Sequence, residues 1–328
     1  MTTPEIIVHR DASLLAKAAA ARTVTRLVDA VTAAGHAHLV LTGGGIGTKV
    51  LEELAAAPAR DAVDWQRVDF WWGDERFQPA GDPERNETGA RSALLDHINA
   101  DPARVHPMPG PDGPDGDDPE AAAARYAGWL AAAARPEDHG PVPSFDVLML
   151  GIGPEGHVAS LFPGMPAVYD NRPVVAVRGS PKPPPVRISL TFPSIQAARE
   201  VWILASGEEK AGAVALALSG SGPVQLPAAG ARGRQRTLFL LDEAAAAKLP
   251  HGYRQASRAL TVAAELSVRA GRRCPSSRTD AWCLARERSR SRPGRSTPRS
   301  MMAGNCRHRR LHDRDGSAPG RPRPCRPW

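Results

Sequence analysis

Short apolar runs alternate with amphipathic or alanine-rich segments along the first 250 residues of the chain. Each run is four or five residues long and is bounded by polar, glycine or proline positions, as expected of buried strands. The eight runs are Ile6–His9, His38–Leu41, Val68–Trp72, Asp146–Leu150, Val174–Val177, Arg187–Leu190, Val201–Ala205 and Thr237–Leu241.

Helical patterns fill the intervals between these runs. The first has apolar residues at helical spacing, namely Leu14, Ala18, Ala21, Val24, Val28 and Val31. The others are Thr48–Ala56, Thr88–Asn99, Pro119–Ala134 and Glu208–Leu218. Strands that alternate with helices form parallel sheets covered on both faces. The pattern therefore predicts an α/β fold with a mostly parallel, doubly wound, Rossmann-like sheet.

Two loops interrupt this alternation. Pro107–Pro119 is dense in proline, glycine and aspartate, which is typical of a surface loop. Gly179–Pro185 contains four prolines and is therefore stiff and poor in amide donors. We expect it to deliver residues 186–190 as an edge strand or a re-entering strand.

Charge divides the chain into two parts. Residues 251–328 contain 19 arginines, no lysine and five acidic residues, a balance of +14. Because the whole chain carries +7, residues 1–250 carry −7 and read as an ordinary acidic protein. We therefore predict a folded domain over 1–250 and an Arg/Pro/Ser-rich tail over 251–328. The tail cannot bury enough apolar surface to offset its chain entropy, so we expect it to be disordered.

The tail leaves two interpretations open. An arginine-rich segment is typical of a nucleic-acid-binding arm. Arginine without lysine is also what GC-rich coding sequence gives when it is read out of frame. The four cysteines, Cys274, Cys283, Cys306 and Cys325, all lie in the tail, so we expect no thiol chemistry in the body.

Targeting signals are not evident in the sequence. The first residues lack a basic segment followed by a long apolar one, which makes a signal peptide unexpected. No apolar run approaches the roughly 18 residues of a membrane helix. We expect a cytoplasmic protein without a membrane partner.

The segment from Gly151 to Gly164 carries the strongest chemical signal. It follows the predicted strand that ends at Leu150, and its glycines free the backbone where that strand ends. His157 comes next, at what we predict to be the first turn of a helix. Open α/β sheets bind ligands at the carboxyl ends of their strands, which makes His157 a candidate base. A purely structural histidine is the alternative.

A second strand end carries a glycine-rich turn, Thr42-Gly43-Gly44-Gly45-Ile46-Gly47-Thr48. Bare backbone amides at a helix N-terminus form an anion site, so Gly43, Gly44, Gly45 and Thr48 are candidate substrate-binding residues. The Gly-Lys-Ser/Thr ending of a P-loop is absent. A tight strand–helix turn without ligand is the alternative.

Charged residues follow other strand ends. Asp74 and Arg76 lie in a predicted turn after Trp72, where Arg76 could hold a phosphate or carboxylate. Arg187 follows the proline run. Lys210 falls in the first turn of a predicted helix, where the helix dipole disfavours a cation unless an anion is bound nearby.

Ser206 and Glu209 have the spacing of a capping box for that last helix. The charged residues have plainer alternatives, namely a surface ion pair at Asp74 and Arg76, a solvated arginine at 187 and chance placement of Lys210. No Cys/His cluster has metal-ligand spacing, and no Gly-x-Ser-x-Gly elbow marks a serine hydrolase.

These motifs together resemble the 6-phosphogluconolactonase family, over Trp72–Phe77, Gly151–Gly164, Pro183–Thr191 and Ser206–Ala211. The resemblance extends to about Leu249 and implies a fold shared with amino-sugar-phosphate deaminases and isomerases, without metal or cofactor. It implies hydrolysis of 6-phospho-D-glucono-1,5-lactone, with His157 as general base, its imidazole kept neutral by a helix N-terminus. Arg187 and Lys210 would hold the phosphate. Arg76 would orient the substrate or stabilise the oxyanion.

The chain departs from the family pattern at two places. Gly45-Ile46-Gly47 replaces the Ser-Thr-Pro of many relatives, which leaves backbone amides and Thr48 as ligands. Glu155 stands where many relatives have aspartate, and we include it with Asp74 among the catalytic candidates. The resemblance leaves the oligomeric state, monomer or small homo-oligomer, open.

Two other functions compete with this one. An amino-sugar-phosphate deaminase or isomerase would need a glutamate where this chain has Phe162, and an apolar ring cannot transfer a proton. A sugar-phosphate-sensing nucleic-acid binder would use the tail. Aromatic residues make up only 5% of the chain and show no base-stacking pattern, so we expect no nucleic-acid partner for the body.

Overall fold

All eight predicted runs form strands in the computed structural model, which describes residues 2–138, 140–249 and 253. These residues belong to one unit, Met1–Ala270. The predicted tail falls outside the described residues except for Tyr253. The strands are β1 (Pro4–His9), β2 (Ala37–Leu41), β3 (Val68–Trp72), β4 (Asp74–Arg76), β5 (Val147–Gly151), β6 (Val174–Val177), β7 (Arg187–Leu190), β8 (Glu200–Ala205) and β9 (Arg236–Asp242).

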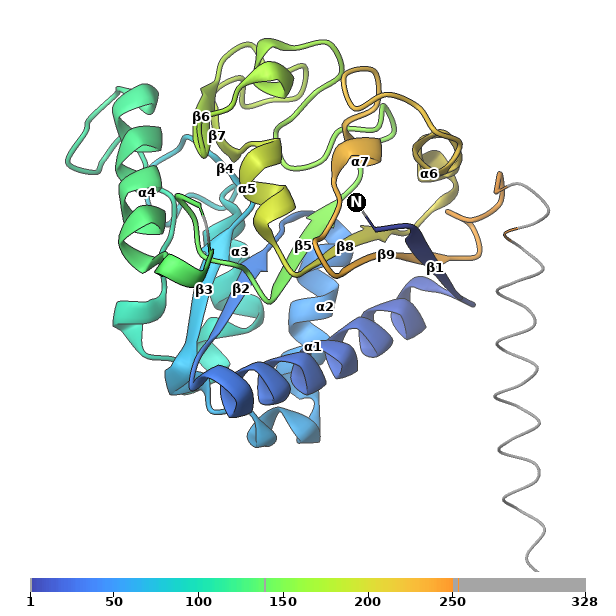
Figure 1. The fold of residues 1–328 in the computed structure, drawn as a ribbon, viewed down its shortest axis with the longest axis horizontal. Coiled ribbons are helices and arrows are strands. Elements are labelled where there is room, and N and C mark those ends of the chain that lie inside the picture. The colour runs from blue at the N-terminus through green and yellow to red at the C-terminus, as the bar shows by residue number, and fades with distance from the viewer. Residues whose placement is uncertain (1, 139, 250–252, 254–328) are drawn as a thin grey trace, which may run out of the picture. The chain divides into compact units, whose positions relative to one another are not determined.

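Within the described residues the strands form two sheets (Figure 1). The larger sheet has the order β1-β9-β8-β5-β2-β3, and every neighbouring pair in it is parallel. This confirms the predicted parallel α/β fold. The smaller sheet, in the order β4-β7-β6, is antiparallel and was not predicted from the sequence.

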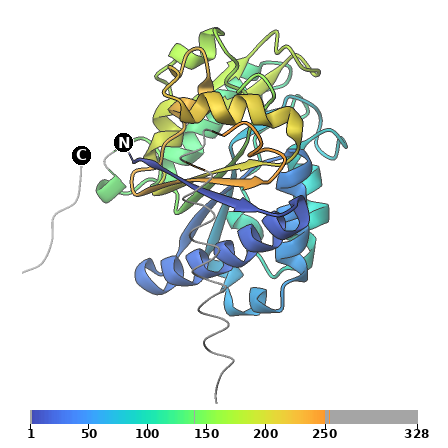
Figure 2. The same cartoon turned by 90° about the vertical axis from the view of Figure 1, so that its right-hand side faces the viewer.

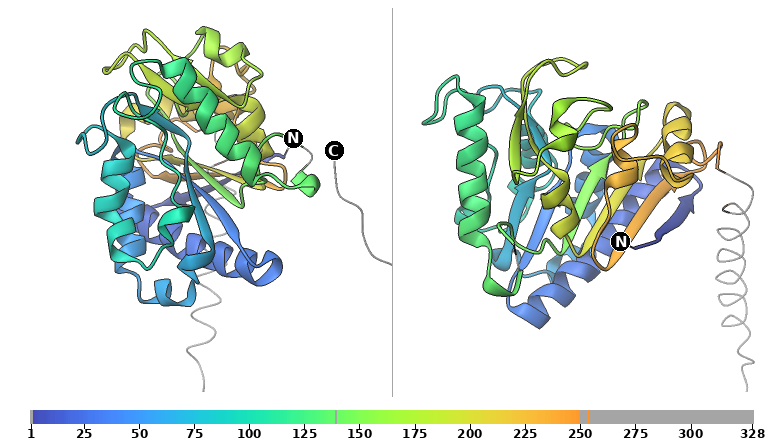
Figure 3. Two further views of the ribbon diagram at one scale, coloured as in Figure 1. Left: turned by 90° about the vertical axis from the view of Figure 1, so that its left-hand side faces the viewer. Right: turned by 45° about the horizontal axis from the view of Figure 1, so that its top comes forward.

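Helices cover both faces of the larger sheet, as predicted (Figures 1 and 2). The helices α1 and α2 lie on one face and α5 and α6 on the other, whereas α4 packs against β6 and β7 of the smaller sheet (Figure 3). Their bounds are α1 Ala12–Ala34, α2 Gly44–Ala56, α3 Asn86–Ala93, α4 Pro119–Ala133, α5 Phe192–Ala197, α6 Ala211–Leu218 and α7 Pro227–Gly230.

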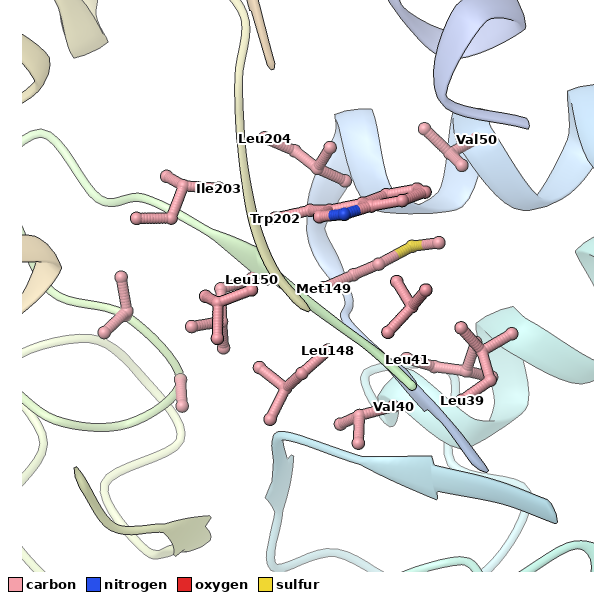
Figure 4. Packing of buried hydrophobic residues seen from close by; sticks show 14 of the residues in the cluster. Leu39, Val40, Leu41, Val50, Leu148, Met149, Leu150, Trp202, Ile203 and Leu204 are labelled. Carbon is pink, nitrogen blue, oxygen red and sulfur yellow. The ribbon is translucent and has the colours of Figure 1, made fainter. Parts of the chain in front are cut away.

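The core is centred on β2, β5 and β8 (Figure 4). Leu39, Val40 and Leu41 are all fully buried although successive side chains of a strand point to opposite faces. Trp202 on β8 is 1% exposed. Because both faces of these strands are buried, their sequences are continuously apolar rather than alternating.

Capping signals fix the ends of α1. The Asp11 side chain accepts a hydrogen bond from the Leu14 amide at 2.9 Å, which satisfies one free donor of the first turn. Gly35 ends the helix in the left-handed conformation at φ 77°, and its amide donates to the Val31 carbonyl at 2.8 Å. Glycine is favoured here because other residues resist positive φ.

Three local predictions are wrong. Residues 152–165 after β5 form turns and an isolated bridge, not a helix. The capping box is not formed, because Ser206 donates to the Asp242 carboxylate at 2.7 Å and the Gly207 cap makes no side-chain hydrogen bond. A short 3-10 turn, Glu208–Lys210, precedes α6 instead, so Lys210 stands just before the helix.

No described helix is both long enough and apolar enough to span a membrane.

Candidate active site

A cleft of about 490 Å³ opens at the carboxyl ends of β2, β5 and β8. This is the end of the parallel sheet at which the sequence placed the candidate site. Eight of the ten candidate residues line it, namely Gly43, Gly44, Gly45, Asp74, Arg76, His157, Arg187 and Lys210. Residues from five separate segments, spread over more than 160 positions of the chain, are thereby brought together.

The two remaining candidates lie elsewhere. Glu155 stands behind His157, with Oε1 at 3.0 Å from Nδ1 of the ring, and contacts the cleft only through its neighbours. Thr48 lies one turn along α2 and faces a different hollow, beside Glu52 and His97. The predicted contact between Thr48 and an anion at the cleft therefore has no geometric basis.

The glycine-rich turn forms the first turn of α2, which begins at Gly44, four residues earlier than predicted. Glycine is needed at position 43 because the Asn86 side chain occupies the space that a Cβ would take. An added Cβ would lie 1.8 Å from Asn86 Oδ1. The first amides of a helix have no partners within it, so this turn presents free donors to the cleft.

The smaller sheet explains how Asp74 and Arg76 reach the cleft. Both belong to β4, a strand rather than the predicted turn, and Asp74 pairs with Ser189 and Arg76 with Arg187 of β7. Because side chains alternate along a strand, positions 74 and 76 share one face with their partners at 189 and 187. The intervening residue, Glu75, points the opposite way.

Glu75 connects the smaller sheet to α3. It is 1% exposed, and its carboxylate accepts hydrogen bonds from the amides of Arg76, Asn86 and Glu87 at 2.7–2.9 Å. Burial raises the pKa of Glu75 to about 7, against Arg85 and the three amides, which favour the charged form. The contacts fix α3 and its Asn86 beside Asp74.

Asp74 is held by polar neighbours from distant segments. Its Oδ2 accepts a hydrogen bond from Ser160 Oγ at 2.6 Å, and its backbone carbonyl accepts one from Asn86 Nδ2 at 2.8 Å. Nη1 of Arg187 lies 3.8 Å from the same carboxylate. Asp74 therefore orients groups of the site, and its own carboxylate has little freedom to move.

Arg76 is held by a single backbone acceptor. Its Nη1 donates to the Glu84 carbonyl. Its buried Nε has no hydrogen-bond partner among the described residues. A buried guanidinium donor without an acceptor is costly. Because Arg76 also lines the cleft, its guanidinium is a candidate to contact an anion there.

His157 lies in a loop rather than on a helix. Its ring stacks on Phe162 with centroids 4.5 Å apart, and its Nδ1 is buried next to Glu155 without the alignment of a hydrogen bond. Burial lowers the pKa of His157, and Lys182 adds to this, whereas Glu155 and Asp74 raise it. Burial therefore favours the neutral imidazole, and the helix terminus that was predicted to do so is not formed here.

The loop around His157 depends on unusual backbone positions. Gly156 has φ 89°, and Ala159 has φ 48°, a left-handed conformation that costs a non-glycine residue about 1 kcal/mol or more. The next residue stabilises the turn at Ala159, because the Ser160 amide donates to Ser189 Oγ at 3.1 Å. This hydrogen bond ties the loop to the smaller sheet.

Arg187 is largely committed to internal contacts. Its side chain is 7% exposed, its Nε donates to the Pro184 carbonyl at 3.2 Å, and its Nη2 donates to the carbonyls of Lys182 and Pro183 at 3.2 and 3.1 Å. It therefore fastens the Gly179–Pro185 loop. Only Nη1 remains for a ligand, which is less than the sequence analysis expected.

Two cleft lysines were missed from the sequence. Lys182, in the loop fastened by Arg187, lies 3.1 Å from Glu155 Oε1. Lys49, on α2, is half-buried in the cleft wall. The stiffness of the proline run was a signal that residue 182 would be held in place, whereas nothing in the helical pattern distinguished Lys49.

Lys210 also lines the cleft, together with Lys49, Arg76, Lys182 and Arg187. Burial lowers the pKa of Lys210 and Lys182 adds to this, whereas Glu209 and Glu155 raise it. The preceding turn is anchored by Asp242, which accepts hydrogen bonds from Ser206 Oγ and the Gly207 amide. Among the described residues, no group of three His, Cys, Asp or Glu side chains is placed to hold a metal ion.

Fold and site together define a class. This is a parallel α/β protein whose basic cleft, at the carboxyl end of its sheet, contains a histidine and suits a small anionic ligand. The model of one family, described as glucosamine-6-phosphate isomerases/6-phosphogluconolactonase, matches residues 10–240. The chain belongs to this family.

Individual relatives agree with the family assignment. The chain is 64% identical to the 6-phosphogluconolactonase of Streptomyces coelicolor, over 76% of this chain and 95% of that protein. It is 53% identical to the 6-phosphogluconolactonase of Mycobacterium tuberculosis, over 75% of this chain and 98% of that protein. The solved structure of the Trypanosoma brucei 6-phosphogluconolactonase superposes with a TM-score of 0.63 at 30% identity, over 76% of this chain and all of that one.

Proposed function

We propose that this chain hydrolyses 6-phospho-D-glucono-1,5-lactone to 6-phosphogluconate, as part of the oxidative pentose phosphate pathway. The observation that carries the proposal is the joint placement in one cleft of His157 and several basic side chains. Burial favours the neutral form of this histidine, which is the form that a base requires. Lactone hydrolysis needs a base beside the carbonyl, and a phosphorylated substrate needs an anion site. The names of the relatives in Streptomyces coelicolor and Mycobacterium tuberculosis support the same reaction.

His157 is the proposed general base. Its Nδ1 is buried beside Glu155, so Nε2 is the nitrogen left to contact water. Nε2 would take a proton from the water that attacks the lactone carbonyl, and the resulting imidazolium would be stabilised by Glu155. The imidazolium then donates this proton to the ring oxygen of the lactone, as the bond between that oxygen and the carbonyl carbon breaks. The new carboxylic acid releases its own proton to solvent.

Arg76 is the proposed stabiliser of the tetrahedral oxyanion. Arg76 lines the cleft, and a donor that is held in place before the reaction stabilises a developing negative charge. Asp74 would act by holding Ser160 and Asn86 in place rather than by moving a proton, because its own carboxylate is engaged.

The phosphate is assigned to basic side chains other than Arg76. Lys210 and Nη1 of Arg187 remain candidates, joined by Lys182. The amides at Gly43, Gly44 and Gly45 form a second donor group at the start of α2. We propose that one of these groups binds the phosphate and the other the sugar hydroxyls. Thr48 is not part of either group.

A direct assay tests the proposal. The purified full-length protein is given freshly prepared lactone, and acid release above the spontaneous rate is followed. His157→Gln should lower kcat by about 10²–10⁴-fold, the usual contribution of a general base, while far-UV circular dichroism and the unfolding temperature stay close to wild type. Absence of hydrolysis by the wild-type protein would refute the proposed function.

A second substrate addresses the competing reaction. Glucosamine 6-phosphate should yield no ammonia, because Phe162, which stacks on His157 and is 1% exposed, offers no proton-transfer group. We expect the enzyme to work in the cytoplasm, without a cofactor, as a monomer or small homo-oligomer. Residues 1–250 are proposed to form the catalytic domain.

A further inference from the structure

We propose that Lys182 is a positioning residue that couples occupation of the cleft by an anion to the interaction between Glu155 and His157. The inference builds on the proposed function, because it concerns the same histidine. The three side chains form a continuous row. Lys182 Nζ lies 3.1 and 3.2 Å from the two carboxylate oxygens of Glu155, and Glu155 Oε1 lies 3.0 Å from His157 Nδ1.

Lys182 stands at the junction between this row and the cleft. Its side chain is 43% exposed and lines the cleft, whereas Glu155 does not line it. An anion that enters the cleft can therefore contact Lys182, and Lys182 in turn contacts Glu155. The ammonium has three donors, so it can serve Glu155 and a ligand from a single position.

The loop that carries Lys182 is closed by its own hydrogen bonds. Arg187 donates to three consecutive carbonyls, at Lys182, Pro183 and Pro184. Ser180 adds two contacts, since its amide donates to the Pro185 carbonyl at 3.0 Å and its hydroxyl to the Lys182 carbonyl at 3.0 Å. The backbone at Lys182 is therefore fixed, and only its side chain is free to change partner.

Three charged groups act on the imidazole. Glu155 belongs to the same loop, Lys182 to the proline loop and Asp74 to β4. The two carboxylates raise the pKa of His157, and Lys182 lowers it through its own charge, in addition to the larger effect of burial. Lys210 is a further cation close to Lys182 and Glu155.

A bound anion changes this balance in one direction. When Lys182 pairs with the anion, its charge is neutralised from the cleft side and Glu155 acts more fully on His157. The imidazole then becomes a stronger base when substrate is in place. In the free enzyme the same histidine stays neutral to a lower pH, so the protein remains ready to bind and react.

Two variants isolate the contribution of Lys182. Lys182→Met removes the charge with a side chain of similar length, and Lys182→Arg retains it. Lys49→Met is the matched control. Lys49 also lines the cleft, but within the described residues it forms no ion pair with Glu155. The pKa of His157 is measured by NMR titration of its ring protons, assigned with His157→Gln, without ligand and at saturating 6-phosphogluconate.

In wild type we expect saturating 6-phosphogluconate to raise the pKa of His157. In Lys182→Met the free enzyme should already have a raised pKa, and the ligand-induced rise should be smaller. Lys182→Arg should restore the wild-type pattern, and Lys49→Met should keep it. The acid limb of kcat/KM should move to higher pH in Lys182→Met only, with KM raised roughly tenfold for the loss of one charged contact.

Equal ligand-induced rises in wild type and Lys182→Met would overturn the inference, and so would an unchanged pKa in the free variant. These outcomes are separate from failure of the proposed function. A protein that binds 6-phosphogluconate but hydrolyses no lactone would refute that function, and the NMR titration would still decide the role of Lys182.

Discussion

Gly153 leaves the space in which the His157 ring lies, and Gly153→Ala is therefore a sharp test of how the base is positioned. A Cβ at this position would lie 1.9 Å from Nδ1 and 2.2 Å from Cε1 of His157, and 2.6 Å from Glu155 Oε2. Gly153 does not have a positive φ, so alanine is not disfavoured by its backbone conformation. The predicted effect comes from the collision alone.

The expected loss of kcat/KM follows from the distance between the added Cβ and the His157 ring. Non-bonded carbon and nitrogen atoms approach to about 3.5 Å, so the ring must move by roughly 1.5 Å to accept the methyl group. A displacement of about 1 Å at a reacting group is enough to cost 10²-fold in rate. We expect kcat/KM to fall by about 10²-fold, or roughly 2.7 kcal/mol of transition-state stabilisation.

Stability should change far less than activity, because the displaced ring can move toward the open cleft. The assay compares lactone hydrolysis and urea unfolding of Gly153→Ala with those of Gly128→Ala. Gly128 lies on the exposed side of α4 with nothing within 4 Å of an added Cβ. That control should keep full activity and gain about 0.4–1 kcal/mol of stability. Wild-type kcat/KM in Gly153→Ala would refute the reasoning.

Three further changes have defined outcomes. Glu155→Gln removes a charge that raises the pKa of His157, so the acid limb of kcat/KM should move to lower pH, and an unmoved limb would contradict this. Burial lowers the pKa of His38 to about 4, below its unfolded value, so the unfolded state binds more protons between about pH 6.5 and 4. Wild type should lose up to about 2.5 kcal/mol of unfolding free energy between pH 7 and 4.5 on this account, and His38→Gln should lose correspondingly less in urea titrations. Truncation after Tyr253 should preserve lactone hydrolysis, since the cleft is lined by residues 12–210, and a large loss of kcat would show that the tail contributes.

The helical pattern of α1 shows how far periodicity alone could go. It gave the element correctly, but Leu14 and Ala21 of the predicted apolar face are exposed. The buried face instead includes Leu15, Ala19 and Leu27. In a helix with so many alanines several faces are nearly equal in hydrophobicity, and the closeness of α1 to α2 and β9 selects among them.

The strand β4 could not be predicted from its own sequence. Asp-Glu-Arg has low strand propensity, and three residues are too few to show alternation. It is a strand because β7, more than 100 residues later, supplies hydrogen-bonding partners at Ile188 and Ser189. The candidate residues Asp74 and Arg76 were recognised by their chemistry, but their common orientation depends on this long-range pairing.

The absence of a helix after His157 has the same kind of cause. The residues from Gly156 onward are compatible with a helix by pattern. The contact between Ser160 and Asp74, 86 positions apart, instead requires the left-handed turn at Ala159. Long-range hydrogen bonds outweigh a weak local preference.

This correction changes how the base is tuned. A helix N-terminus would act on the imidazole through a fixed dipole, and a substrate could not alter it. The Glu155–Lys182 pair also acts on the pKa of His157. Because Lys182 lines the cleft, we expect this effect to change with what occupies the cleft. The same loop also sets the ring position through Gly153. Substitutions at 153 should therefore act mainly by displacing the ring and lower the rate at all pH values, whereas substitutions at 182 should mainly move the pH profile.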